Sequence, residues 1–590
     1  MTSGGGSSVM NSQASHTQRE EEELERRFRY PSTHWLGSDF SRLATLSCCL
    51  LGIQFCWSVE FAYGSNYLIS LGMTKSQMSL VWLAGPISGL IMQPLVGVWS
   101  DQCTSPMGRR RPFMIVATGM VLFSLFTIGW TVEFVESLGG KASEAKYFAV
   151  MSFFILDFAI NAVQACARAL IVDVLPGSMQ EIGNAWASRM IGLGNVFGYL
   201  MGYLDLVKFL PFFGDKQLKV LTVIAAISLV LTVGITSCCV VEKRIYNSDL
   251  EDYDLNPIQK TIKSLFTIFK TMFNLPGPIA KVCNTQFFSW MGWFPFMFYA
   301  TVWVSEIEFD GKPPIDESLG GNDSVGDSTR TGSFALVIFS VVSLVSSFVL
   351  PLIVKNKNNN NESNNTNNSR YNKYLLNLPQ WFTLTLAMYG ICMLCTSFIW
   401  TVTGATILIA LCGIPWSVSM WAPFSLIAEH LRNQNLEDDQ SAQTEEYRRL
   451  TDVVTEEHEN DRDDDTVPLG AQIPASNYLS RRANNPSDPP PRYSGTFDED
   501  QPLAQSSDHV EEVQPPKSVE DAGMILGIHN IYIVIPQLLI SLIGSIIFYI
   551  YEVAKSKGSG TGISAILKLA GLLSLVASFV SLSIWKNKHH

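Results

Sequence analysis

The sequence carries little charge. Only 16% of its 590 residues are Asp, Glu, Lys or Arg, whereas 47% are hydrophobic. This balance is too apolar for a soluble globular protein. The formal net charge of -12 comes largely from an acidic N-terminal stretch and a late polar insert, and it argues against a nucleic-acid partner.

The sequence also lacks the motifs of common enzymes. No nucleotide-binding glycine loop, metal-ligand cluster or nucleophile and base arrangement stands out, so we expect neither an enzyme, nor a metal site, nor a bound cofactor. Its eleven cysteines lie mostly in apolar segments without CxxC spacing, which predicts buried free thiols. The polar start has no signal-peptide core, so we expect the first apolar segment to direct membrane insertion.

Long apolar segments are what the sequence does have. Each is long enough to cross a bilayer, which takes roughly 20 residues, and together they predict an all-α multi-pass membrane protein. The twelve expected spans are about 42–66, 78–99, 113–135, 147–174, 184–208, 218–241, 283–305, 333–354, 380–401, 404–428, 521–551 and 563–585.

Basic loops predict the orientation. The stretch GRRRP at 108–112 and the basic residues after the sixth span lie close to membrane ends, where Lys and Arg favour the cytosol. Both termini are then cytosolic. Lys208, Lys216 and Lys219 oppose this orientation, because they flank a loop that it places outside.

The spans divide into two sets of six, as expected for two packed halves around a central substrate site. The predicted organisation is a disordered cytosolic N-terminus at 1–41, a first half at 42–241, a cytosolic linker at 242–282, a second half at 283–585 and a tail at 586–590. Two polar inserts in the second half, 355–379 and 429–520, are predicted to be disordered cytosolic segments.

The later insert contains the sequence PPRY. Pro490, Pro491 and Tyr493 fit the ligand of a WW domain, which would make a ubiquitin ligase with such a domain a partner. The alternative is a chance match in a proline-rich linker.

The fourth span carries a polar stripe within LDFAINAVQACARALIVD. At about 100° per residue, its four polar side chains share an arc of about 60° on one helix face. These are Asp157, Asn161, Gln164 and Arg168. A charge at the centre of a lipid-facing helix costs about 2.5–3.5 kcal/mol on insertion scales, so this face is predicted to meet protein or a water-filled cavity.

Asp157 and Arg168 are separated by about 16 Å along the helix axis, which excludes a direct ion pair. Asp157 can remain neutral by holding a proton, whereas Arg168 needs an anion or water. We interpret the stripe as a protonatable ligand site, with hydrogen bonding between helices as the alternative.

Other spans add polar and aromatic groups. Gln54, Trp57 and Glu60 follow at three-residue steps in the first span, and Trp293 in the seventh could stack on a sugar ring or simply pack. Glycines in the fifth span predict a seam for close helix packing. They are Gly194, Gly198 and Gly202.

The stretch GPISGLIMQPLVGVWSDQCTSPMGRRRP resembles the span two to three region of the sucrose/proton symporter family, a glycoside-cation symporter branch of the major facilitator superfamily. Further resemblances are GIQFCWSVE, the polar stripe of span four, GNVFGYLMGY, WMGWFPF, GIPWSVSMWAPF and LGIHNIYIVIPQ. They occur in order and cover nearly all spans.

The resemblance implies the fold of that superfamily and proton-driven uptake of sucrose, maltose or a related α-glucoside by alternating access. It implies proton coupling by Asp157, Arg168 and Glu60. The implied sugar-binding residues are Asp157, Asn161, Gln164, Gln54, Trp57, Trp293 and Asn530. The implied gating motif at the cytosolic end consists of Asp101, Gly108, Arg109 and Arg110.

Glu60 stands where plant members tend to have Gln, which favours a fungal or animal-like member and leaves the preferred sugar open. Two alternatives remain: a sugar sensor that signals through the 429–520 insert, and a sodium-coupled glycoside carrier. We expect a monomer in the plasma membrane, with the vacuolar membrane as the alternative.

Overall fold

The computed structural model describes residues 33–34, 39–175, 179–242, 275–309, 323–354, 376–430, 517–554 and 562–585, with scattered helical positions between 259 and 272. The described chain is helical except for one short pair of strands and the connecting turns. The predicted all-α class is therefore confirmed.

The first half contains six membrane-length helical segments. They are α2 (Asp39–Ser70), α3 with α4 (Lys75–Val81 and Ala84–Asp101), α5 (Arg111–Gly129), α7 (Ala145–Val174), α8 (Gln180–Tyr203) and α10 (Gln217–Cys239). Two short helices, α6 (Thr131–Ser137) and α9 (Leu206–Phe209), lie in the connections.

The second half supplies the other six. They are α12 (Gly277–Glu308), α13 (Ser324–Ile353), α15 (Leu378–Cys395), the span Val402–His430 that begins with α16 (Val402–Leu411), α19 (Lys517–Ala554) and α20 (Ile563–Trp585). Ten segments of the described chain are apolar enough to cross a membrane. The remaining two, α8 and α12, are more polar but have 24 and 32 residues and lie at the predicted fifth and seventh spans.

Several boundaries differ from the sequence-based expectations, including the start of α13 at Ser324 instead of 333. The second span is two helices, because the chain breaks at Trp82 and Leu83. Helix α12 begins at Gly277, within the predicted linker, since Pro276 and Pro278 suit a helix start. Strand β1 (Thr33–His34) pairs antiparallel with β2 (Val240–Val241), so these residues of the predicted disordered N-terminus are ordered.

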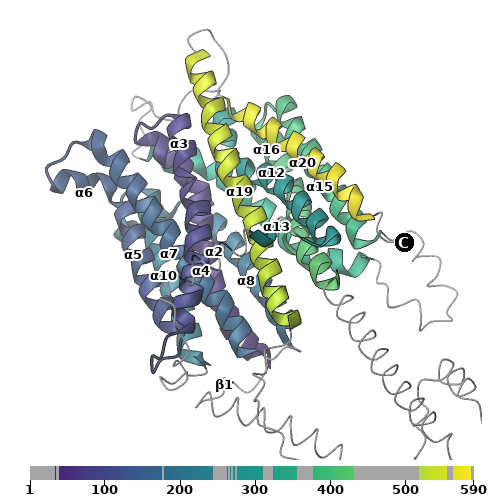
Figure 1. Ribbon diagram of the computed structural model, residues 1–590. Coiled ribbons are helices and arrows are strands. Elements are labelled where there is room, and N and C mark those ends of the chain that lie inside the picture. The colour runs from purple at the N-terminus through teal and green to yellow at the C-terminus, as the bar shows by residue number, and fades with distance from the viewer. Residues whose placement is uncertain are drawn as a thin grey trace, which may run out of the picture. The chain divides into compact units, whose positions relative to one another are not determined.

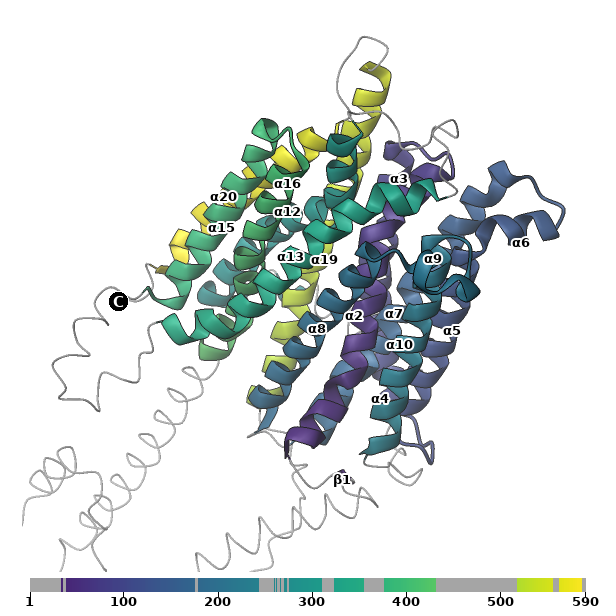
Figure 2. The same ribbon diagram turned by 180° about the vertical axis from the view of Figure 1, so that it is seen from behind.

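The helices of each half gather together, with α2 at the centre of the first (Figure 1; Figure 2). Helix α2 packs against α8 and α10, while α12, α15 and α20 pack together in the second half. The halves meet through α2, α8, α12 and α13. We call the end of the helices that carries the 102–110 loop the inner end, following the predicted orientation.

The predicted glycine seam is confirmed on α8. A Cβ atom at Gly194 would lie 2.6 Å from the Leu51 carbonyl oxygen, and one at Gly198 would lie 2.5 Å from the Ser58 Cβ. Both distances are too short for real contacts. The seam therefore lets α8 approach α2 closely, which positions the polar residues of both helices.

Gly198→Val should destabilise the protein by about 1–3 kcal/mol, because the added methyl groups overpack the contact between α8 and α2. The measurement is Tm of the detergent-purified protein. Gly119→Ala is the control, because a Cβ atom there meets nothing within 4 Å. Equal Tm values for the two variants would contradict the close approach.

Candidate functional site

The polar stripe of α7 becomes more exposed toward the inner end. Asp157 is 2% exposed and Asn161 is buried, whereas Gln164 is half-buried and Arg168 is exposed. Arg168 makes no ion pair with any described residue. The four side chains predicted to share a face thus run from a sealed interior to an accessible end.

Helix α4 makes room for the buried end of this stripe. A Cβ atom at Gly85 would lie 3.6 Å from Asp157 Oδ1, and one at Gly89 would lie 3.4 Å from Asn161 Oδ1. Ser88, between these glycines, accepts a hydrogen bond of 2.8 Å from Asn161 Nδ2. The small residues of α4 therefore let polar groups of α7 pack at the helix interface.

Two acidic side chains meet between α2 and α7. Glu60 is 4% exposed, and it lies close enough to Asp157 for their charges to interact. Both carboxyl oxygens of Glu60 and Oδ1 of Asp157 are buried without a hydrogen-bond partner. Neither acid has an ion pair within the part of the chain that the structure describes. Two carboxylates in one buried site repel each other, so a single proton held by the pair is its chemically simplest state.

Amide and indole groups on α2, α7 and α8 hydrogen-bond to one another near the acid pair's helices. Trp57 Nε1 donates to Gln164 Oε1 at 3.2 Å, and Gln54 Nε2 donates to Asn195 Oδ1 at 2.9 Å. The structure thus brings Gln54, Trp57 and Gln164 to the same region where α2 meets α7 and α8. These groups offer hydrogen bonds suited to hydroxyls.

A cavity of about 20 Å³ lies between the halves in this region. Gln54 and Asn195 line it from the first half, and Phe296 and Trp416 line it from the second. It is far below the roughly 300 Å³ of ligand pockets, so the described state cannot hold a disaccharide.

Asn530 contributes from the second half. Its Nδ2 donates to Gln93 Oε1 of α4 at 3.2 Å, so it bridges the two halves. Gln93 and Ser88 were not singled out from the sequence, because isolated polar residues in the apolar second span form no obvious stripe.

Trp293, which was predicted to contact the sugar, is buried in the described state. Its side chain is 0% exposed, its ring stacks on Tyr389 at 3.8 Å, and its Nε1 donates to Ser419 Oγ at 3.3 Å. In the described state the ring is therefore enclosed by protein, and its predicted sugar contact stays a prediction for a more open state. Trp416, edge-on to Trp293 at 4.9 Å, lines the central cavity instead.

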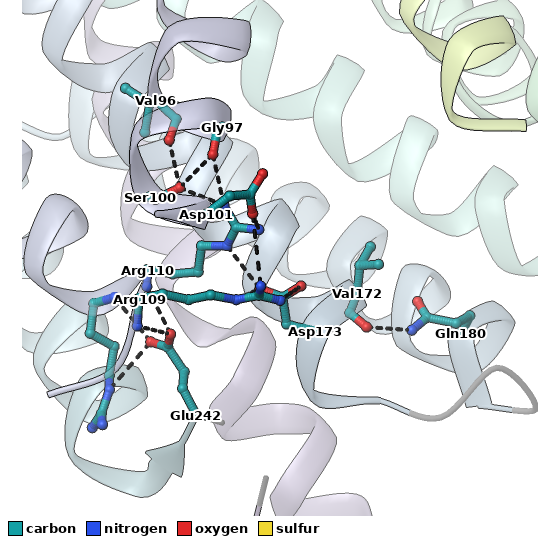
Figure 3. Close-up of polar contacts among 11 residues, drawn as sticks. Val96, Gly97, Ser100, Asp101, Arg109, Arg110, Val172, Asp173, Gln180 and Glu242 are labelled. Atoms are coloured by element: carbon teal, nitrogen blue, oxygen red, sulfur yellow. Dashed lines mark hydrogen bonds and ion pairs between the residues drawn. The ribbon is translucent and has the colours of Figure 1, made fainter. Parts of the chain in front are cut away.

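The predicted gating residues form an ion-pair network at the inner end (Figure 3). Arg110 pairs with Asp101, and its Nε lies 2.8 Å from Asp173. Arg109 pairs with Asp173 at 2.6 Å. Burial alone would lower the pKa of Arg110, but Asp173 and Asp101 raise it above its usual value. Asp173 therefore belongs to this network, although sequence reasoning missed it.

Glu242 caps the helix that follows the motif. Its carboxylate accepts from the backbone N–H groups of Arg109, Arg110 and Arg111 at 2.8, 2.7 and 2.9 Å, which suits the positive end of α5. Gly108 has a φ of 107°, and a Cβ atom there would lie 2.8 Å from Glu242 Cδ. Glycine is therefore required at 108 for two reasons: the positive φ of the backbone, and the space that the Glu242 side chain occupies.

Apart from the bond between Asn530 and Gln93, the direct polar contacts described between the halves gather at the opposite, outer end. They are Ser65 with Phe298, Asn66 with Thr329, Lys75 with Glu306, Ser79 with Ser541 and Asp205 with Arg330. The outer end is therefore sealed by bonds from one half to the other, while the α7 stripe opens toward the inner end.

Lys219 at the outer end has its charge balanced. Its Nζ lies 2.5 Å from Glu133 and 2.6 Å from Asp215. Burial alone would raise the pKa of Glu133, but the hydrogen bond from Lys219 lowers it. Because the charge of Lys219 is neutralised by these two acids, this lysine no longer argues strongly against the predicted orientation.

Residues 46–437 match the family described as Major Facilitator Superfamily. The general alpha-glucoside permease of Schizosaccharomyces pombe is 35% identical over 462 residues, covering 67% of this chain and 81% of that protein. Sucrose transport protein SUT3 of Oryza sativa subsp. japonica is 30% identical over 330 residues, covering 52% and 63%.

Solved structures show the same fold at low identity. A structure reported for substrate recognition in proton dependent oligopeptide transporters has a TM-score of 0.53 at 10% identity, covering 93% of this chain and 99% of that chain. A bacterial homolog of the human lysosomal transporter Spinster, inward-facing and occupied, has a TM-score of 0.50 at 10% identity, covering 93% and 98%.

The fold and the relatives define an integral, multi-pass membrane transporter and not an enzyme, as predicted. The chain belongs to the Major Facilitator Superfamily and, within it, to the family of the fission-yeast permease and the rice sucrose transport proteins. The family predicted from the motifs is therefore confirmed. Pro490, Pro491 and Tyr493, like most of the 429–520 insert, lie outside the described residues.

Glu242→Gln should lower the free energy of unfolding by about 1–3 kcal/mol, because three buried N–H groups lose a charged acceptor. Tm of the purified transporter measures the loss. Glu136→Gln is the matched control, since Glu136 is exposed and its side chain makes no hydrogen bond or ion pair with the described residues. A Glu242 variant as stable as the Glu136 variant would show that the cap is dispensable.

Proposed function

We propose that this transporter couples the inward movement of protons to uptake of a disaccharide such as sucrose, maltose or another α-glucoside by alternating access. The observation that carries the proposal is the buried pair of Glu60 and Asp157, which no described cation neutralises and which lies at the head of a polar stripe that opens inward. The names of the yeast and rice relatives support the substrate class.

The proton neutralises the acid pair before the halves rearrange. An unpaired carboxylate in an apolar interior is costly, and protonation removes most of that cost. With a proton bound, the site can pass through a closed state. Without one, the buried charge raises the barrier, so proton and sugar move together.

The sugar binds between the halves in a state more open than the described one. Asn161, Gln164 and Gln54 offer amide groups to its hydroxyls, while Trp57 and Trp416 offer apolar ring faces. Separation of the outer contacts, such as Lys75 with Glu306, opens the outward path. Asn530 joins the site from the second half.

Arg168 takes the coupling role at the inner end. It is exposed and makes no ion pair among the described residues, so it carries a fixed charge along the open part of the path.

The proton gradient is energetically sufficient. A proton moving through ~100 mV releases about 2.3 kcal/mol, and each pH unit adds about 1.4 kcal/mol. At ~120 mV and ~1.5 pH units, the total approaches 5 kcal/mol. This is enough to hold the sugar concentration inside roughly a thousand to ten thousand times above that outside. One proton per sugar therefore suffices.

The plasma membrane is the proposed location, where such a gradient faces external sugar. The PPRY sequence is proposed to recruit a WW-domain ubiquitin ligase.

Asp157→Asn should abolish uphill, pH-driven uptake of radiolabelled maltose or sucrose while sugar exchange at equal concentrations continues, because the amide cannot carry a proton. Proteoliposomes report both activities. Asp327→Asn is the matched control, since Asp327 is exposed and only pairs with Arg330 on the same helix. Undiminished uphill uptake by the Asp157 variant would refute the assignment.

Replacing sodium by choline should leave uptake unchanged, whereas acidifying the outside should raise it, because protonation of the acid pair precedes transport. The measurement is initial uptake over a series of external pH values. Dependence on sodium would favour the glycoside carrier coupled to sodium. Absence of any flux in active vesicles would favour the sugar sensor.

A further inference from the structure

A second cavity of about 10 Å³ lies inside the first half, between α2, α5, α7 and α10. Glu60 borders it, together with Tyr67 of α2, Leu125 and Ile128 of α5, and Thr222 of α10. Its size is near the lower limit for holding one water molecule.

Apart from Asp157, with which it shares a site, Glu60 has no polar partner among the described residues. Both of its oxygens are buried without a hydrogen bond, and buried polar groups in folded proteins are nearly always satisfied. The titratable groups that face it or share its cavity are Asp157 on α7 and, on α2, the thiol of Cys56 and the phenols of Tyr63 and Tyr67. Neither α5 nor α10 adds a charged side chain to the described cavity wall. A water in the cavity would satisfy Glu60.

The cavity extends from Glu60 toward the outer end. Glu60 lies about 15 Å from the outer end of α2, while Tyr67 is only three residues from that end. The Tyr67 hydroxyl donates to the Ile128 carbonyl oxygen at 3.0 Å, next to the last residue of α5. Leu218, the second residue of α10, also lines the cavity.

This cavity and the central cavity lie on different faces of α2. Glu60 and Tyr67 line the cavity inside the first half, which we call the inner-bundle cavity. Gln54 and Phe61 line the central cavity between the halves. At 100° per residue, the two sets are about 120° apart around the helix. The acid pair is therefore approached from two separate directions.

We propose that the inner-bundle cavity is the outer port for the transported proton, where one water relays a proton from the outer solution to Glu60, which shares it with Asp157. The relaying water donates one proton to a Glu60 oxygen and takes one from the outer side, so it is unchanged. Proton and sugar then reach the acid pair by different routes, one within the first half and one between the halves. This inference rests on the proposed function and adds the path of its coupling ion.

The port does not leak in the described state. Leu125, Ile128 and Leu218 make its outer walls apolar, and a volume for one water is no continuous chain to the outside. Proton uptake therefore requires the outer ends of α2, α5 and α10 to loosen. That movement accompanies opening of the outer contacts between the halves.

Tyr67→Phe tests the route, because it removes the hydroxyl at the outer part of the cavity and keeps the ring. Half-maximal uphill uptake should need an external proton concentration about fivefold higher. That factor is the change in affinity expected from the loss of one net hydrogen bond. The sugar half-saturation concentration and sugar exchange without a pH gradient should remain those of the wild type. Tyr389→Phe is the matched control, since its hydroxyl also donates to a backbone carbonyl, Gly292 O at 2.9 Å, away from both cavities.

Two further variants complete the test. Thr222→Val removes a cavity hydroxyl with little change in side-chain volume. It should also raise the external proton concentration needed for half-maximal uptake, and it serves as the test if the Tyr67→Phe protein cannot be purified. Leu336→Phe fills the central cavity, and it should change the sugar half-saturation concentration without moving the pH dependence.

A wild-type pH dependence in the Tyr67 and Thr222 variants, with normal sugar exchange, would overturn the separate port. A joint change of pH dependence and sugar affinity would overturn it too, because it indicates one shared route. If the wild type itself shows no proton-driven uptake, the proposed function fails. If it does and Asp157→Asn uncouples it, only the port is in question.

Discussion

The structure depends on one constraint: ionisable side chains inside an apolar environment must be enclosed by protein and provided with a partner. Glu60 and Asp157 are enclosed by α2, α4 and α7, yet no described cation pairs with them. The surrounding packing follows from this. Gly85 and Gly89 give α7 room for polar groups, and Gly194 and Gly198 bring α8 close enough for its amide to meet α2. A proton is the partner that fits two unpaired acids.

The two ends of the molecule differ in what holds them. At the outer end, hydrogen bonds and ion pairs such as Lys75 with Glu306 join one half to the other. At the inner end, the arginine network and the Glu242 cap tie helices within the first half. The inner network therefore keeps the first half rigid, while the bonds that must break during transport lie elsewhere.

Much of this arrangement is readable from the sequence. Long apolar segments predict the spans, the stripe from Asp157 to Arg168 predicts an enclosed helix face, and the glycines of α8 predict its seam. These features repeat at helical spacing within one segment, so local periodicity reveals them. The gating motif is also local, because Asp101, Arg109 and Arg110 are close in the chain and lie together.

What escapes the sequence is long-range pairing. Glu242 caps a helix more than a hundred residues earlier, and nothing near it signals that contact. The proximity of Glu60 to Asp157 depends on how α2 lies against α7. The enclosure of Trp293 in the described state is also invisible in the sequence, because aromatic residues in a core and at a binding site have the same local pattern.

The central claim is that sugar cannot enter without a proton, and it is tested most directly by driving protons with sugar. Proteoliposomes at equal internal and external pH, without a membrane potential, receive an inward sugar gradient while a trapped dye reports internal pH. The account predicts internal acidification that requires sugar, at about one proton per sugar. Sugar entry at the normal rate with no change in internal pH would contradict it.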